Sequence, residues 1–151
     1  MRQPIQVLVY AVRRVGDHWE YLLLRRILSR GGFWQGVTGG VRQNEGLVEA
    51  ARRELLEETG LVPALLERVD YSYSFPLDDE WRHLYSPDVK EIMEYIFVAH
   101  VGAQQEPRID PREHDAWRWC CFKEALELLH WPENKEALKR CHEILTARSS
   151  L

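Results

Sequence analysis

Three glutamates that lie close together in the sequence are the residues best suited to chemistry. Glu54, Glu57 and Glu58 are spaced i, i+3 and i+4, so an α-helix places their side chains on one face, about 5–6 Å apart. Like charges at this spacing repel each other. A divalent cation removes the repulsion, and carboxylate oxygens suit magnesium, which binds through a few carboxylates together with substrate phosphates. The spacing therefore predicts a metal-binding helix.

Apolar residues around these acids predict the helix that positions them. Residues 47–59 carry apolar side chains at helical spacing, which predicts a buried stripe opposite the acids, formed by Leu47, Val48, Ala51, Leu55 and Leu56. Gly60 follows where a helix often ends in a left-handed residue. Gly39 and Gly40 precede the helix and allow other groups to approach the backbone closely. The simpler alternative is a solvated helix face, rich in Glu and Arg, that binds nothing.

Residues 39–61 match one long motif. They read Gly, five residues, Glu, seven residues, Arg-Glu, an apolar residue, any residue, Glu-Glu, any residue, Gly and an apolar residue. This is a complete Nudix box, so the chain resembles a Nudix hydrolase. The resemblance implies the α/β class, with the Nudix α/β/α sandwich and its mixed β-sheet. It also implies an enzyme that acts on acid anhydrides of phosphorus compounds.

The resemblance implies a role for each polar position of the motif. Glu54 and Glu58 are the expected metal ligands, and Glu57 is a further expected ligand. In the family the arginine of the motif orients an acidic neighbour, a role that here falls to Arg53. The first glutamate of the motif has a supporting role, which here falls to Glu45. The expected cofactor is Mg²⁺, for which Mn²⁺ can substitute.

The chain as a whole is expected to form one domain, residues 1–151. Its 151 residues can bury about 70 % of the unfolded surface in a single core, and 45 % hydrophobic with 29 % charged residues is typical of globular proteins. Strands are predicted at 5–14, 20–26, 65–75, 91–101 and 116–120, with a hairpin turn at Gly16-Asp17 and a short apolar piece at 33–37. Further helices are predicted at 123–129 and 133–147. Strands before and after an early helix favour a mixed sheet covered on both faces.

Charge and cysteine content limit the kinds of partner. The net charge of −4 argues against a nucleic acid polymer, whose binding surface would be basic. A small phosphorylated substrate can arrive as its metal complex. The chain has no segment typical of a signal peptide or membrane span, so no membrane partner is expected. Three cysteines, two of them adjacent at Cys120 and Cys121, indicate reduced thiols in a cytoplasmic protein. The oligomeric state stays open between monomer and homodimer.

A second resemblance covers the segment before the motif. Residues 33–40 read Phe-Trp-Gln-Gly-Val-Thr-Gly-Gly, which resembles the dihydroneopterin triphosphate pyrophosphatase branch of the family. Diadenosine polyphosphate and RNA-cap-type branches tend to carry Pro-Lys-Gly here. Three further patches fit the same branch: Arg82-His83 with Tyr85 and Pro87, Glu113-His114 before a Trp-containing strand, and Trp131 with Asn134.

This branch resemblance implies residues for the substrate and a distant acid. Glu113 is the expected third metal ligand, while Arg26 and Thr38 are expected at the phosphates or the pterin. Substrate contacts are also expected from Trp34, Arg82 and His130. His130 stands where the branch has a small hydroxyl residue, a departure that leaves the bound base open.

Each of these residues also has a structural interpretation. Trp34 and Trp131 have the character of core residues, and Arg82 of a solvated loop residue. Tyr71, Tyr73 and Phe75 alternate as one face of a strand, which is typical of packing. Glu94, among apolar strand neighbours, is either another acid near the metal or a paired structural charge.

The expected reaction is attack of water on a phosphorus atom, which asks a protein mostly for positioning and charge neutralisation. The catalytic residues are predicted to be Arg53, Glu57, Glu58 and Glu113, with Glu57 or Glu113 as the proton acceptor. The products would be pyrophosphate and the monophosphate of a pterin or nucleoside. Two alternatives remain: a dinucleoside polyphosphate hydrolase, and a nucleotide-binding module without turnover.

Overall fold

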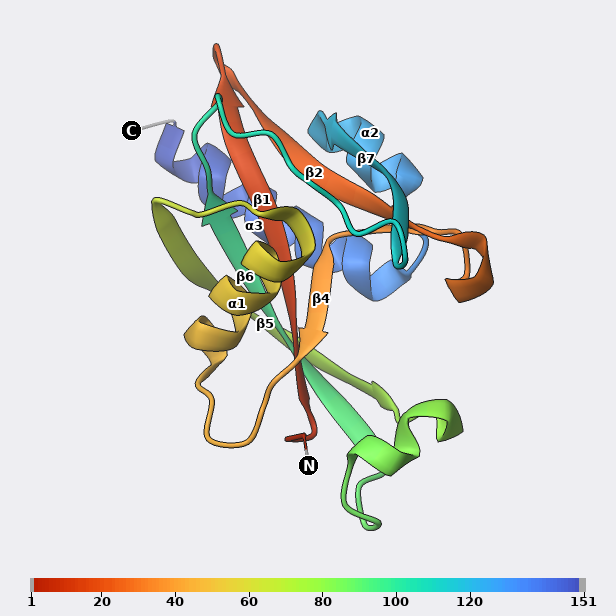
Figure 1. Ribbon diagram of the computed structural model, residues 1–151. Helices are drawn as coiled ribbons and strands as arrows, with labels where there is room; N and C mark the ends of the chain where they lie inside the picture. Colours follow the sequence, from red (N-terminus) through yellow and green to blue (C-terminus); the bar gives the residue numbers. More distant parts are fainter. Residues whose placement is uncertain (1, 150–151) are drawn as a thin grey trace.

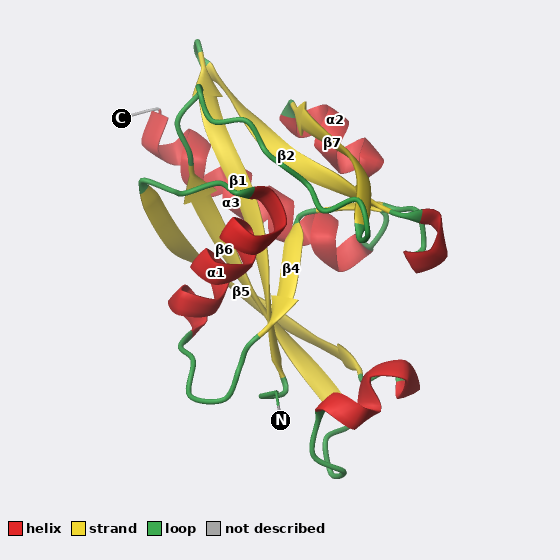
Figure 2. Ribbon diagram, viewed as in Figure 1, coloured by secondary structure: helices red, strands yellow, loops and turns green. Residues whose placement is uncertain are grey.

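A computed structural model describes residues 2–149 as a mixed β-sheet with helices on both faces. Figures 1 and 2 show α1 in front of the sheet and α3 behind it. The strands are β1 Ile5–Val15, β2 His18–Arg26, β3 Trp34–Gln35, β4 Val37–Gly40, β5 Leu65–Pro76, β6 Glu91–His100 and β7 His114–Cys120. The helices are α1 Leu47–Thr59, α2 Phe122–Leu128 and α3 Pro132–Ser149, with short 3₁₀ helices η1 Leu28–Arg30 and η2 Asp79–Leu84. The predicted α/β/α sandwich with a mixed sheet is confirmed.

Strand β1 is the centre of the sheet. One edge pairs in parallel with β6 from Ile5 to Val12. The other edge is shared by two antiparallel partners, because β4 pairs with Gln6–Val9 and β2 with Val12–Val15. The β1–β2 pairing is the predicted hairpin. Beyond β2 lie β3 and β7, and beyond β6 lies β5.

The two faces of β1 build two separate cores. Val7, Val9 and Ala11 face α1, where they join Ala50, Ala51 and Leu55. Leu8, Tyr10 and Val12 face the opposite side, where they join residues of α2 and α3 that include Ala125, Leu138 and Cys141. Burial on both faces explains why this strand is a continuous apolar run without alternation. The core therefore holds α1 and α3 on opposite sides of one strand.

The face that α1 buries differs from the predicted stripe. Val48 and Leu56 are 49 % and 53 % exposed, so their assignment to the buried stripe is wrong. The buried residues are Ala50, Ala51, Leu55 and Thr59. Because Glu54 and Glu58 follow Ala50 by one and two helical turns, they flank the buried stripe instead of lying opposite it.

Element boundaries otherwise agree closely with the sequence. The helix predicted at 47–59 is α1, and Gly60 ends it in the predicted left-handed conformation, with φ of 73°. Strand β7 begins two residues before its prediction and α3 runs to Ser149. Within residues 2–149 no helix is both long and apolar enough to cross a membrane.

The corrected face of α1 gives a direct stability test. Leu55→Ala removes a fully buried side chain and should lower the free energy of unfolding by about 2–5 kcal/mol. Leu56→Ala, next in sequence but exposed, should change it by less than about 0.5 kcal/mol. Urea denaturation of both variants measures this difference. Equal losses would contradict the orientation of α1.

Candidate active site

A cleft of about 1320 Å³ runs past the C-terminal half of α1. Its lining includes most of the residues that the sequence singled out: Arg26, Thr38, Arg53, Glu54, Glu57, Glu58 and Glu113. These side chains come from β2, β4, α1 and the loop before β7. The fold thus brings the motif helix and the distant acid to one place.

Strand β4 lies directly against Glu54, the first of the three clustered glutamates of α1. A Cβ atom at Gly39 would overlap the carboxylate of Glu54. Gly39 does not adopt a positive φ, so space, and not backbone freedom, accounts for glycine here. The missing side chain lets the Glu54 carboxylate rest on the strand at the edge of the cleft.

Arg53 joins the acids to the rest of the motif. Its Nε and one terminal nitrogen donate to the two carboxylate oxygens of Glu45 at 2.7 and 2.9 Å. The other terminal nitrogen donates to Glu54 at 2.7 Å and to Glu57 at 3.2 Å. A further bond reaches the backbone oxygen of Gly40 at 2.9 Å. The hydrogen bonds from Arg53 lower the pKa of Glu45 to about 2, so Glu45 remains a charged anchor for this arginine.

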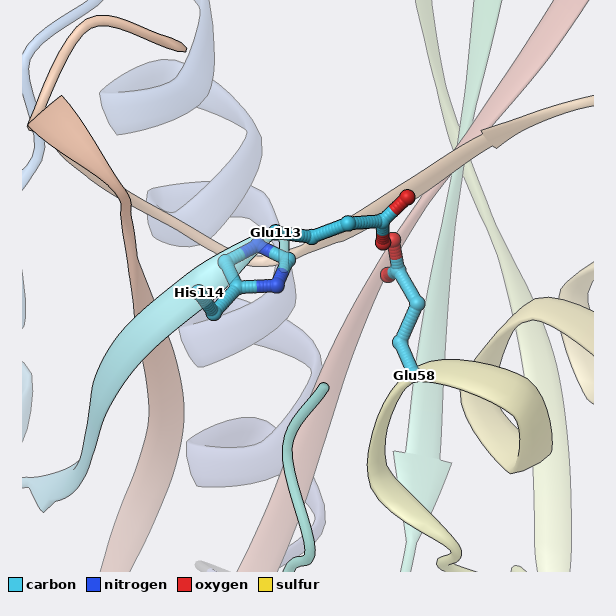
Figure 3. A group of neighbouring side chains, drawn as sticks. All are labelled: Glu58, Glu113 and His114. Carbon is cyan, nitrogen blue, oxygen red and sulfur yellow. The ribbon is translucent and has the colours of Figure 1, made fainter. Parts of the chain in front are cut away.

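Glu58 and Glu113 meet across the cleft although they are far apart in sequence. Figure 3 shows their carboxylates pointing toward each other, one from the end of α1 and one from the start of β7. One carboxylate oxygen of Glu58 is buried without a hydrogen-bond partner among the described residues. Burial raises the pKa of Glu58, and the negative charges of Glu54 and Glu113 raise it further. Such an oxygen is poorly satisfied without a cation.

Backbone hydrogen bonds fix the loop that carries Glu113. The Glu113 nitrogen donates to the Asp110 oxygen at 3.0 Å, and its own oxygen accepts from the Ile27 nitrogen at 3.0 Å. His114 follows on the strand, is 1 % exposed, and has no partner for either ring nitrogen among the described residues. Burial lowers the pKa of His114 to about 4, helped by the positive charges of Arg26 and Arg30. His114 therefore stays neutral near pH 7, and the sequence had assigned it no role.

The donor set of this cluster fits a divalent cation. Ligand atoms of Glu58, Glu113 and His114 all lie within 4.8 Å of one another, and Glu54 is close enough to Glu58 to raise its pKa. Carboxylate oxygens are the ligands that Mg²⁺ and Mn²⁺ prefer. A cation at this point would supply the partner that the buried Glu58 oxygen lacks. Glu57 is 49 % exposed and pairs with Arg42 and Arg53, so it lies at the rim of the cluster.

Three residues expected at the substrate lie outside the cleft lining. Trp34 packs against the core beneath α3, with Arg25 5.6 Å from its ring centroid. Arg82 donates to the backbone oxygens of Val89 and Pro87 at 2.7 and 3.3 Å, and so fixes the segment around η2. His130 stacks on Phe33, with ring centroids 5.7 Å apart. Phe33 and Trp131 do line the cleft, so the Phe33 ring that His130 stacks on lies between His130 and the cleft.

Glu94 belongs to a different part of the cleft from the metal cluster. It is 3 % exposed and accepts hydrogen bonds from Gln6 and Tyr73. Both donors are uncharged, so among the described residues Glu94 is held by hydrogen bonds and not by an ion pair, and it is absent from the group of possible metal ligands. Tyr73 also lines the cleft, while the neighbouring Tyr71 packs against the core.

Comparison with known proteins agrees with this geometry. The profile of the NUDIX domain family matches residues 2–141. The chain belongs to the Nudix family. Relatives of this chain are named as a diphosphatase and a pyrophosphohydrolase. The domain is therefore a hydrolase that acts on phosphoanhydrides.

Several relatives match this chain in sequence. An octanoyltransferase of Myxococcus xanthus is 37 % identical over 134 residues, which cover 89 % of this chain but 35 % of that protein. A dihydroneopterin triphosphate diphosphatase of Haemophilus influenzae is 31 % identical over 91 % of this chain and 85 % of its own length. An RNA pyrophosphohydrolase of Caulobacter vibrioides is 36 % identical over 64 % of this chain and 60 % of its own. The chain thus spans about a third of the octanoyltransferase, whose name describes a much longer protein.

A solved structure supports the fold over nearly the whole chain. A protein of Listeria monocytogenes described as a NUDIX hydrolase superposes with a TM-score of 0.84 and 29 % identity, covering 97 % of both chains. The Nudix sheet and its helices are therefore shared over 97 % of this chain.

The contact between Gly39 and Glu54 predicts a metal-binding defect without loss of fold. Gly39→Ala should push the Glu54 carboxylate away from the cluster and weaken Mg²⁺ binding by at least about tenfold. Stability without metal should change little, because the displaced group is the end of a flexible side chain. Calorimetric Mg²⁺ titration measures the effect, with Gly102→Ala as a control at a glycine where a Cβ would make only an ordinary van der Waals contact, with Gln104 at 3.7 Å. Unchanged affinity in Gly39→Ala would contradict the role given to this contact.

Proposed function

We propose that this chain hydrolyses a pterin or nucleoside triphosphate to a monophosphate and pyrophosphate, with Mg²⁺ as cofactor and Mn²⁺ as a substitute. The observation that carries the proposal is the buried, unpartnered oxygen of Glu58 facing Glu113 inside the cleft. Burial and repulsion from Glu54 and Glu113 make this position unfavourable for a charged side chain. It becomes favourable when a cation and the phosphates of a substrate enter.

The polar residues around the motif acids each have a part in the proposed reaction. Glu54, Glu58 and Glu113 would hold the cation, which neutralises phosphate charge and lowers the pKa of a coordinated water. Arg53 holds Glu54 in place and does not need to touch substrate. Arg26 lies across the cleft from Glu58, close enough to lower the pKa of that acid, and would bind phosphate oxygens together with Thr38.

The chemical step is a displacement at phosphorus. The oxygen of water forms a bond to the α-phosphorus, and the bond from this phosphorus to the oxygen that bridges the α and β phosphates breaks. The proton of the water passes to a carboxylate, for which Glu113 and the rim residue Glu57 are the candidates. Pyrophosphate leaves with the electron pair of the broken bond.

Two observations support a triphosphate substrate over a dinucleoside polyphosphate. Residues 33–40 carry the Phe-Trp-Gln-Gly-Val-Thr-Gly-Gly segment, and a relative that matches most of this chain is named for dihydroneopterin triphosphate. A nucleotide-binding module without turnover is disfavoured, because such a module should have lost at least one acid of the motif helix, and this chain carries all of them. Within this proposal the protein is cytoplasmic and a monomer or homodimer, and its partner is a small molecule.

Product analysis tests the proposed reaction. Purified protein with Mg²⁺ should release pyrophosphate from dihydroneopterin triphosphate or a nucleoside triphosphate. The panel should include diadenosine tetraphosphate and 5′-triphosphorylated RNA, since one relative is named an RNA pyrophosphohydrolase. Release of orthophosphate alone, or clear preference for diadenosine tetraphosphate or RNA, would overturn the proposal.

Removing one charge from the cluster should abolish most turnover. Glu58→Gln keeps the side-chain shape, and its loss of charge should reduce kcat by at least about a hundredfold. Glu136→Gln changes a half-exposed acid of α3 that pairs with Arg140 and lies outside the cleft lining; it is the matched control and should keep full activity. Near-normal turnover in Glu58→Gln would remove this acid from the mechanism.

A second substitution tests the distant acid. Glu113→Gln should lower turnover strongly and leave thermal stability nearly unchanged, because it relieves repulsion within the cluster. The alternative is that Glu113 only forms an ion pair with Arg30, in which the guanidinium nitrogen and the carboxylate oxygen are 4.0 Å apart. In that case the substitution would change the free energy of unfolding by about 0–1 kcal/mol and leave the rate unchanged. Asp115→Asn, which breaks the neighbouring pair with Arg25, provides the control for a surface ion pair.

A further inference from the structure

A row of polar side chains crosses the sheet beside strand β4. Glu94 on β6 is paired in register with Gln6 on β1 and with Tyr73 on β5. These strands lie side by side in the sheet (Figure 1). Asn134, near the start of α3, completes the group. All four residues line the cleft, and the proposed reaction uses none of them.

Burial makes this group costly for the fold. Glu94 is 3 % exposed and Asn134 is 7 % exposed. A carboxylate in this environment destabilises the protein unless hydrogen bonds compensate for its lost hydration. Apolar residues fill the neighbouring β6 positions Ile92 and Ile96, so an apolar residue would also suit position 94. The acid therefore has a purpose other than packing.

The hydrogen bonds of the group all run toward Glu94. The Asn134 amide nitrogen donates to the Tyr73 hydroxyl at 2.8 Å, and that hydroxyl donates its one hydrogen to Glu94. The Gln6 amide nitrogen donates to the other Glu94 oxygen. Tyr10 donates to the Asn134 backbone oxygen at 2.9 Å and so ties the start of α3 to the sheet. Glu94 is the final acceptor of a rigid network.

Glu94 keeps capacity to accept more hydrogen bonds. An ionised carboxylate has about four acceptor positions, and the network occupies two of them. Because Glu94 lines the cleft, a ligand there can reach the remaining positions with N–H donors. A ligand that offers two adjacent donors can engage both carboxylate oxygens at once, which adds specificity as well as affinity.

We propose that Glu94, supported by Gln6, Tyr73 and Asn134, binds the 2-amino-4-oxopyrimidine edge of the substrate's ring. This edge presents a ring N–H beside an amino group and is shared by pterins and guanine. Adenine and cytosine present an amino group beside a ring acceptor, and uracil presents one N–H between two carbonyls. Phe75 and Trp131 line the same cleft and provide aromatic surfaces for the ring. This inference rests on the proposed function and names the substrate class.

Comparison of GTP, ITP and ATP tests the inference in the unmodified protein. ITP keeps the ring N–H of GTP and lacks only the 2-amino group. GTP should be hydrolysed with a kcat/KM about 10- to 100-fold above that of ITP, and ATP should be the poorest of the three. Dihydroneopterin triphosphate carries the same edge and should also exceed ITP. Its ratio to GTP distinguishes a pterin from a guanine nucleotide as the better substrate.

Substitution of the acid provides the second arm. Glu94→Gln replaces an acceptor with a donor and should lower kcat/KM for GTP and dihydroneopterin triphosphate about a hundredfold, while ATP hydrolysis stays within about twofold of the parent. Glu91→Gln is the matched control, since Glu91 is an exposed acid on the same strand outside the cleft lining. Equal loss for every nucleotide in Glu94→Gln would show a purely structural role and overturn the inference.

Equilibrium binding separates this inference from the proposed function. Calorimetry of the α,β-methylene analogues of GTP, ITP and ATP with the unmodified protein and Mg²⁺ measures base selectivity without turnover and without a variant that must fold. Preference for GTP, without pyrophosphate release from any triphosphate, would uphold the base subsite and refute the proposed reaction. Pyrophosphate release with equal binding of the three nucleotides would uphold the proposed reaction and refute the base subsite.

Discussion

Mutual repulsion among carboxylates is the constraint on which the cleft depends. Glu54, Glu57 and Glu58 share one helix, and Glu113 approaches them from another part of the sheet. Burial raises the pKa values of both Glu54 and Glu58, and neighbouring acids raise them further. The protein tolerates this because Arg53 neutralises one side of the cluster and Glu45 holds Arg53 by two hydrogen bonds. The other side is left for a cation.

The central strand explains how the two ends of the cleft are held together. Gln6 on β1 is paired with Gly40 of β4 on one edge and with Glu94 of β6 on the other. The adjacent residue Gly39 contacts the motif acid Glu54. The metal cluster and the proposed base subsite therefore lie on neighbouring positions of one rigid sheet. A substrate that spans both would be positioned by strands with buried neighbours and not by flexible loops.

Local patterns explain what could be predicted from the sequence. Helix α1, its end at Gly60 and the β1–β2 hairpin follow from periodicity and glycine placement over short distances. The buried face of α1 was partly mispredicted. Val48 and Leu56 fit the helical period, but they lie beside the buried stripe and are exposed to solvent. The period of a helix fixes which residues share a face, and the packing partner decides how that face is rotated.

Contacts between distant segments explain what could not be predicted. Gln6 and Glu94 are separated by 88 positions, and only the parallel pairing of β1 with β6 brings them together. Arg82 and Trp34 have types suited to ligand binding, yet one is engaged by loop carbonyls and the other by the core. His114 follows Glu113 directly in sequence, and its burial became evident only once β7 was paired with β2.

The most direct measurement is anomalous diffraction from crystals grown with Mn²⁺ and a triphosphate analogue that cannot be hydrolysed. The account predicts manganese density between the carboxylates of Glu54, Glu58 and Glu113, with phosphate oxygens of the analogue on the same ions. Manganese bound only at exposed acids, with the Glu58 and Glu113 carboxylates turned away from every ion around the bound analogue, would contradict it.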